Sequence, residues 1–146
     1  MLQVPWYVTA LGAAIVWGIH YPLVDHALKR LSLVSVLVLG ALPMIGLVFL
    51  FPRALAADLA AIGAMSWTER LPVLAVAATS LAGVVLLYVS ISGKNATLAS
   101  LIEISYPVFV ALFAYVLFRE IHVTAPVILG AALVFAGVGI ITAYGS

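Results

Sequence analysis

The residue best placed to do chemistry is Glu103, which lies inside an apolar run from Ala96 to Phe118. A charged side chain at the centre of a bilayer costs roughly 2.5–3.5 kcal/mol on insertion scales, so such residues usually face a protein interior or a watery cavity. Pro107 lies four positions later and has no N–H, so the carbonyl of Glu103 loses its helical partner. Ser100 and Tyr106, three positions to either side, complete a partly polar stripe.

One position therefore offers an ionisable carboxyl and a freed backbone oxygen. That combination suits the binding of a cation or a proton at membrane depth. The alternative is a protonated Glu103 that hydrogen-bonds a neighbouring helix and only holds the bundle together.

A second set of candidates lies in the sequence Trp17-Gly18-Ile19-His20-Tyr21-Pro22. Trp17 and Tyr21 are four positions apart and so share one face of a helix. Pro22 predicts a bend. His20 lies at a depth comparable to that of Glu103, which makes a contact between them feasible; otherwise His20 is a polar residue satisfied at the helix end.

The composition predicts an integral membrane protein. Of the 146 residues, 66% are hydrophobic and 8% are charged, and the mean hydropathy is +1.32. A soluble domain carries about a quarter charged residues, so this chain has too little polar material to cover a water-facing surface. The net charge of +1 gives no argument for a nucleic-acid partner.

The residue types argue against an enzyme. Cysteine is absent, which excludes disulfides and a Cys nucleophile. The sequence offers no nucleophile–base pair and no glycine-rich phosphate loop. Three scattered histidines and one deep carboxylate do not make a metal-ligand set. We therefore expect no catalytic activity, no metal and no cofactor.

Five segments are long enough to cross a hydrocarbon core of about 30 Å, which takes about 20 residues. Because the chain lacks the alternation of a barrel strand, we expect an all-α bundle of five transmembrane helices in a single domain over residues 1–146. The predicted spans are residues 6–24, 31–51, 71–92, 96–118 and 123–144. In the last span, small residues at helical spacing predict a packing or dimerisation face formed by Gly130, Ala132, Ala136 and Gly137.

The connection between the second and third predicted spans has a pattern of its own. Leu55, Leu59 and Ile62 recur at helical spacing, which predicts a short amphipathic helix on the membrane interface, the alternative being an ordinary loop. Ser66 and Glu69 then fit a capping box before the next span.

Lysine and arginine are divided evenly between the two sides of the membrane. The predicted topology puts Lys29, Arg30 and Lys94 on one side, and Arg53, Arg70 and Arg119 on the other. Orientation follows the Lys/Arg bias of short loops. Equal counts favour insertion in both orientations, the alternative being that weaker cues such as the N-terminal amine select one.

These features resemble the EamA-type module of the drug/metabolite transporter superfamily. The resemblance rests on Trp17-Gly18, on the run LASLIEISYPVFVALFAYVLFRE and on the closing LGAALVFAGVGII. Its most specific part is Tyr106-Pro107-Val108 followed by Arg119-Glu120, which is closest to the short, five-helix bacterial and archaeal members. One departure is that many relatives carry Glu directly before this proline, where the present chain has Tyr106.

The resemblance implies a multi-pass secondary transporter or exporter in the cytoplasmic (inner) membrane. Larger relatives have ten helices in two inverted modules, so this chain would be half of such an assembly, completed by an antiparallel second copy or by a related chain. Carried over, the family cavity would include Tyr88. The full set expected to bind substrate or a proton is then Trp17, His20, Tyr21, Tyr88, Ser100, Glu103 and Tyr106.

We expect a small metabolite or an organic cation as substrate, with coupling to protons through Glu103. A carboxylate among aromatic rings suits an amine through charge pairing and cation–π contact. Two alternatives remain open: a partner subunit that transports nothing by itself, and a flippase for a lipid or a lipid-linked sugar. Substrate identity, transport direction and stoichiometry do not follow from the sequence.

Overall fold

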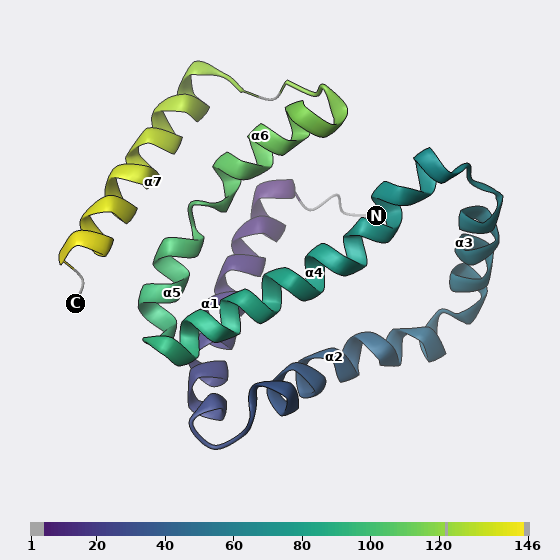
Figure 1. Ribbon diagram of the computed structural model, residues 1–146, viewed down its shortest axis with the longest axis horizontal. Coiled ribbons are helices and arrows are strands. Elements are labelled where there is room, and N and C mark those ends of the chain that lie inside the picture. The colour runs from purple at the N-terminus through teal and green to yellow at the C-terminus, as the bar shows by residue number, and fades with distance from the viewer. Residues whose placement is uncertain (1–4, 122, 145–146) are drawn as a thin grey trace. The chain divides into compact units, whose positions relative to one another are not determined.

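The computed structural model describes residues 5–121 and 123–144, and this part of the chain contains helices but no strand (Figure 1). The helices are α1 (Trp6–Leu28), α2 (Leu33–Leu50), α3 (Pro52–Ala64), α4 (Trp67–Gly93), α5 (Ala96–Glu103), α6 (Tyr106–Phe118) and α7 (Ala125–Tyr144). Five segments are long and apolar enough to cross a membrane: α1, α2, α4, α5 with α6, and α7. The prediction of an all-α membrane protein is confirmed.

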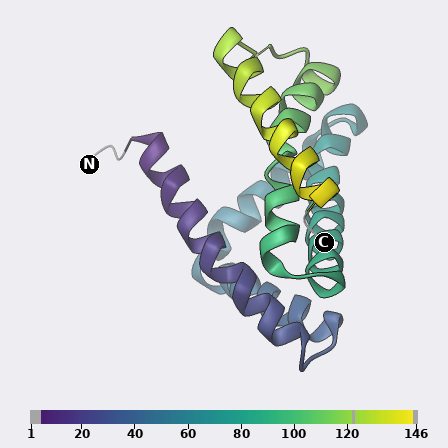
Figure 2. The ribbon, with the colours of Figure 1, turned by 90° about the vertical axis from the view of Figure 1, so that its left-hand side faces the viewer.

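The helices form two compact units, of which the first contains the chain up to Leu23 and from Ser90 onward. In this unit α5 packs against α7, and α6 runs beside α7 (Figures 1 and 2). Ile91, Ala96 and Ala99 are its buried apolar residues among those described. Because two of the three are alanines, the start of α5 lies close to its neighbours.

The second unit comprises Val24–Val89, and in it α2 contacts α3. The predicted helix between the second and third spans is confirmed as α3. Tyr88 is buried, and its hydroxyl lies 3.6 Å from the position that a Cβ on Gly40 would take. The Tyr88 hydroxyl therefore lies against α2 at an ordinary van der Waals distance from position 40.

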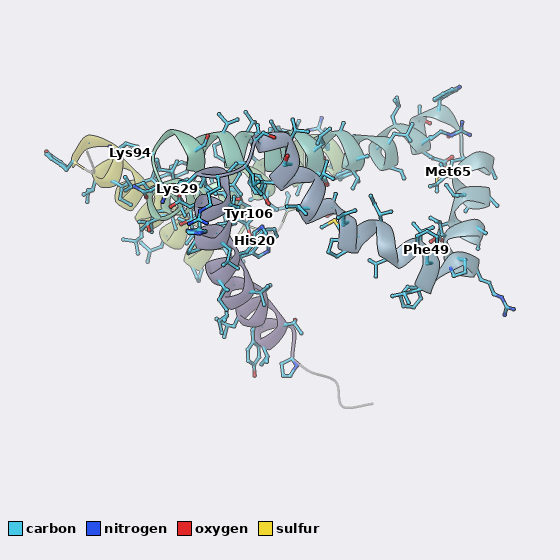
Figure 3. The ribbon with its side chains drawn as sticks, turned by 90° about the horizontal axis from the view of Figure 1, so that it is seen from below. His20, Lys29, Phe49, Met65, Lys94 and Tyr106 are labelled. Atoms are coloured by element: carbon cyan, nitrogen blue, oxygen red, sulfur yellow. The ribbon has the colours of Figure 1, made fainter. Side chains whose placement is uncertain are left out.

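Most large apolar side chains in both units are exposed. Phe49 is 81% exposed, projecting from α2 (Figure 3), and Leu133 on α7 is 67% exposed. A water-soluble monomer rarely leaves so much apolar surface uncovered. Lipid tails or another protein chain must cover these helices, which is what five membrane spans require.

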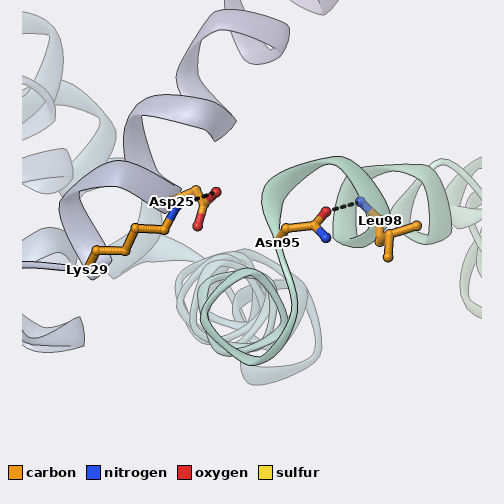
Figure 4. Close-up of polar contacts among 4 residues, drawn as sticks. All are labelled: Asp25, Lys29, Asn95 and Leu98. Carbon is orange, nitrogen blue, oxygen red and sulfur yellow. Dashed lines mark hydrogen bonds and ion pairs between the residues drawn. The ribbon is translucent and has the colours of Figure 1, made fainter. Parts of the chain in front are cut away.

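The helix ends differ from the predicted ends where capping groups act. The span predicted over 31–51 begins at Leu33, because the Ser32 side chain accepts the Ser35 N–H at 3.3 Å. The span predicted over 6–24 extends to Leu28, with an Asp25–Lys29 pair at 3.3 Å along the added turn (Figure 4). The span predicted over 123–144 begins at Ala125.

The largest difference is in the fourth span, predicted as one helix over 96–118. The structure divides it into α5 and α6 by a turn at Ile104–Ser105. Pro107 follows as the second residue of α6, a position where a missing N–H is tolerated. The start of α5 agrees with the prediction, because Asn95 Oδ1 accepts the Leu98 N–H at 2.8 Å (Figure 4).

The span predicted over 71–92 begins earlier, at Trp67, as part of a capped junction with α3. Ser66 precedes the helix, and its N–H and hydroxyl both donate to Glu69 Oε2, at 2.9 and 2.6 Å. The predicted Ser66–Glu69 pairing is confirmed, although the Ser66 hydroxyl donates to the carboxylate, whereas in a regular capping box its oxygen accepts the N–H of the residue three positions later.

Arg70 closes the same junction from the other side. Its Nε donates to the Ile62 carbonyl at 3.1 Å, and its Nη2 donates to the carbonyls of Gly63 and Met65, each at 2.9 Å. The guanidinium also lies 4.9 Å from the centre of the Trp67 ring. A cation at a helix C-terminus is favourable, and here it satisfies carbonyls that α3 leaves free. Arg70 thus joins the end of α3 to the start of α4.

Replacing Arg70 by Lys should destabilise the protein, although the charge is retained. Lys lacks the planar fork that reaches several carbonyls at once. Because hydrogen bonds to charged groups contribute about 1.5–3 kcal/mol each and are not additive, we expect a loss of about 1–3 kcal/mol in the free energy of unfolding. Equilibrium unfolding in mixed micelles measures it. The control is Arg53→Lys on exposed α3; equal stability of both variants and the parent would contradict the assignment.

Candidate functional site

The contact at the centre of the site joins Tyr21 to Glu103. The Tyr21 hydroxyl donates a hydrogen bond to Glu103 Oε2 at 2.6 Å, between residues 82 positions apart. Tyr21 lies on α1 and Glu103 is the last residue of α5, so this bond connects two helices of the same unit. A distance of 2.5–2.7 Å is typical of a hydroxyl that donates to a charged oxygen.

Three aromatic side chains of α1 lie together around this bond. The Trp17 ring is 5.2 Å from the His20 ring in an edge-on arrangement and 5.5 Å from the Tyr21 ring. The His20 and Tyr21 rings are 6.3 Å apart. These separations fall in the range of favourable aromatic pairs, so Trp17 and His20 restrict how the Tyr21 ring can turn. Trp17 is 47% exposed and can present part of its ring to a ligand.

The backbone beside Glu103 departs from the helix that precedes it. The Ile104 N–H bonds to the Ser100 carbonyl at 3.0 Å, whereas the Ser105 N–H bonds to Ile102 at 3.2 Å, which is a tighter turn. The donor that would reach the Glu103 carbonyl in a regular helix belongs to Pro107, which has none. The C-terminal end of α5 therefore presents carbonyl oxygens next to the carboxylate, and both favour a cation.

Glu103 has no fixed cationic partner within residues 5–121 and 123–144. None of the lysines or arginines there makes an ion pair with it, and its hydrogen-bond donor is the neutral Tyr21 hydroxyl. This part of the chain also contains no group of three or more His, Asp or Glu side chains that could hold a metal. The site is therefore a single half-buried carboxyl that remains available to an incoming positive charge.

The other residues predicted from the sequence take different places. Ser100 lies one turn before Glu103, and its hydroxyl donates to the Thr97 carbonyl at 3.0 Å. Tyr106 begins α6 and is 58% exposed; Figure 3 labels it together with His20. Tyr88 is buried in the other unit. Pro22 lies inside α1, which continues past it as one helix.

The sequence interpretation put both His20 and Tyr21 in the site and singled out His20 for a contact with Glu103, without assigning Tyr21 as the donor. The structure uses the next residue, Tyr21. A signal was present, because Tyr21 shares a helix face with Trp17 and lies at nearly the same depth as His20. Only the rotation of α1 about its axis distinguishes the two residues, and neighbouring spans determine that rotation.

An apolar groove of about 530 Å³ lies between α6 and α7. Its lining residues are Ile104, Pro107, Val108, Ala111, Leu112, Tyr115, Val123, Val127, Ile128, Gly130, Ala131 and Val134. Phe109 and Phe135 also pair edge to face across these helices, with ring centres 6.3 Å apart. No motif in the sequence predicted this groove.

The small residues predicted to form a packing face all lie on α7: Gly130, Ala132, Ala136 and Gly137. A Cβ added at Gly130 or Gly137 would meet no side chain within 4 Å. Close approach inside the described part of this chain therefore does not require glycine at either position. Both remain open to lipid or to another protein chain.

The family relationship agrees with this fold. Residues 4–143 match the model of the EamA-like transporter family. No curated protein and no solved structure matches the chain significantly. A match over nearly the whole length, together with five apolar helices, supports one conclusion: this multi-pass membrane protein belongs to the EamA-like transporter family.

Proposed function

We propose that this chain is a secondary transporter that moves a small organic cation or metabolite across the cytoplasmic membrane, with Glu103 as the binding residue for substrate and proton. The observation that carries the proposal is the environment of the carboxyl. Glu103 lies at a helix break inside a membrane span, bonds to a neutral hydroxyl and has no cationic partner among the described residues. A deep carboxyl in that setting is a binding site by default.

The aromatic side chains beside Glu103 also support the binding of an organic cation. An ammonium that approaches Glu103 would meet the Trp17 and Tyr21 rings, whose centres are 5.5 Å apart. Aromatic faces attract organic cations, most strongly where water is excluded. If one carboxyl takes either a proton or the substrate cation, their movements are coupled, because the two cannot occupy it together.

We further propose that the working unit is an antiparallel dimer, formed by two copies or with a related chain. Five spans place the two ends of one chain on opposite sides, and an inverted second copy would build the repeat that transporters use for alternating access. The equal Lys/Arg counts and the open glycines of α7 support this arrangement. If the chain is a silent subunit, it will transport only when a partner chain is present.

A flippase is a second candidate function, and the groove between α6 and α7 favours it. The groove lies between two membrane spans and is lined by apolar residues, so a lipid tail would fit its chemistry. Transport assays distinguish the two functions directly. An exporter moves a water-soluble cation between compartments, whereas a flippase moves a labelled lipid between leaflets.

Glu103→Gln should abolish pH-dependent transport of an organic cation by the purified protein in proteoliposomes. The amide keeps the shape of the side chain and still accepts from Tyr21, but it carries no charge and takes up no proton. We expect the rate to fall by at least about tenfold, as the loss of a charge interaction of about 1.5 kcal/mol implies. The control is Asp58→Asn, which removes an exposed carboxylate on α3. Undiminished pH-dependent transport by Glu103→Gln would refute the role of Glu103.

Cysteine labelling tests the orientation that an antiparallel dimer of identical chains needs. Gly63→Cys and Gly93→Cys lie near opposite ends of α4, and an added Cβ meets nothing within 4 Å at either glycine. The chain has no other cysteine to react. We expect a membrane-impermeant thiol reagent to label part of each variant in intact cells and the rest after permeabilisation. Labelling of only one site in intact cells would exclude dual insertion and direct the search to an inverted partner chain.

A further inference from the structure

We propose that Tyr21 is a latch on Glu103: its hydroxyl holds the carboxylate of the empty protein, and an arriving cation weakens that hold and frees α5 to move. The inference rests on the proposed binding role of Glu103 and adds a specific conformational step to it. It makes the Tyr21 hydroxyl a positioning group that opposes substrate binding, whereas the Tyr21 ring still faces the arriving cation.

The hydrogen bond between Tyr21 and Glu103 is a strong one. Tyr21 donates to Glu103 at 2.6 Å, and the Tyr21 ring is flanked by Trp17 and His20. A hydroxyl bond to a charged oxygen is roughly twice as strong as one between neutral groups. The carboxylate is thus held where the aromatic cluster of α1 places it.

The Tyr21 bond and a cation bound to Glu103 weaken each other. A cation on Glu103 neutralises the charge that makes the Tyr21 bond strong, so the bond weakens when the site is filled. Thermodynamic linkage requires the converse, namely that the bond weakens the binding of the cation by the same factor. Removing the Tyr21 hydroxyl should therefore raise the affinity for a cation.

The helix α5 is short and is bounded at both ends by non-helical residues. It has eight residues, and only Lys94 and Asn95 separate it from α4. At its other end the Ile104–Ser105 turn separates it from α6. Packing against α7 and the bond to Tyr21 both help to hold this short helix. Release of the bond allows α5 to tilt about the turn without disturbing α6, and Glu103, its last residue, moves with it.

The test compares the parent protein with Tyr21→Phe in lipid nanodiscs. The probe is tetraphenylphosphonium, and two quantities are measured: its dissociation constant, and hydrogen exchange of the α5 amides with and without the probe. Phe keeps the ring and its packing against Trp17 while removing the donor. The matched control is Tyr144→Phe, which deletes the hydroxyl of an exposed tyrosine at the end of α7, away from Glu103 and from the groove.

The latch predicts that Tyr21→Phe binds the probe up to about tenfold more tightly, because a larger fraction of the molecules is then free to bind. Exchange of the α5 amides should also be faster in this variant without probe, and the probe should accelerate it in the parent protein but change it little in Tyr21→Phe. Tyr144→Phe should behave as the parent does. Unchanged exchange in α3 establishes that every variant is folded.

Weaker binding by Tyr21→Phe would overturn the latch, since the Tyr21 hydroxyl would then strengthen substrate binding. Equal exchange of α5 in the two proteins without probe would also overturn it, because the bond would not restrain the helix. If the parent protein binds no probe, the proposed cation specificity fails by itself. The exchange comparison without probe then decides the latch alone, with faster exchange supporting it.

Discussion

The constraint on which the whole structure depends is that the bilayer interior offers no water to the backbone. Each N–H and C=O at that depth must find a partner within the protein, so spanning segments are helical. The described chain obeys this almost throughout, and its five apolar segments carry helices. The interruption at Ile104–Ser105 is therefore informative, because irregular backbone at membrane depth is tolerated where protein or a watery cavity surrounds it.

The same constraint explains why Glu103 and its backbone belong to one feature. A proline that removes a backbone donor and a carboxyl that needs solvation are each unfavourable next to lipid tails. Placed together, they require the same shelter, which the aromatic cluster of α1 partly supplies through Tyr21. The arrangement is asymmetric, since the shelter provides a donor to the carboxylate but no opposite charge. No lysine or arginine in the described part of the chain forms an ion pair with Glu103.

Much of the fold could be predicted from local sequence because local physics determines it. Hydropathy gave the five spans, periodicity gave α3, and Ser66 with Glu69 marked the start of α4. Pro107 indicated where regular hydrogen bonding would stop, although not that the turn would precede it at Ile104–Ser105.

The contacts between segments were not predictable in the same way. In water, an amphipathic stripe identifies the face that a helix buries, but a span that is apolar on all sides carries no such mark. Sequence alone therefore could not rotate α1 to choose Tyr21 over His20, nor place Arg70 on three carbonyls at and just beyond the end of α3. The groove between α6 and α7 depends on the fit of two such helices and was hidden for the same reason.

The division of the fourth span has a consequence for the membranes in which this protein can work. At a rise of about 1.5 Å per residue, the eight residues of α5 extend about 12 Å and the thirteen of α6 about 20 Å. Neither rod crosses a hydrocarbon core of about 30 Å, so the span reaches both surfaces only when the two are nearly collinear. Hydrophobic mismatch would then act on the joint: a thin bilayer favours a bent span and a thick one a straight span. Membrane thickness thereby affects the angle between α5 and α6, and with it the position of Glu103 at the end of α5.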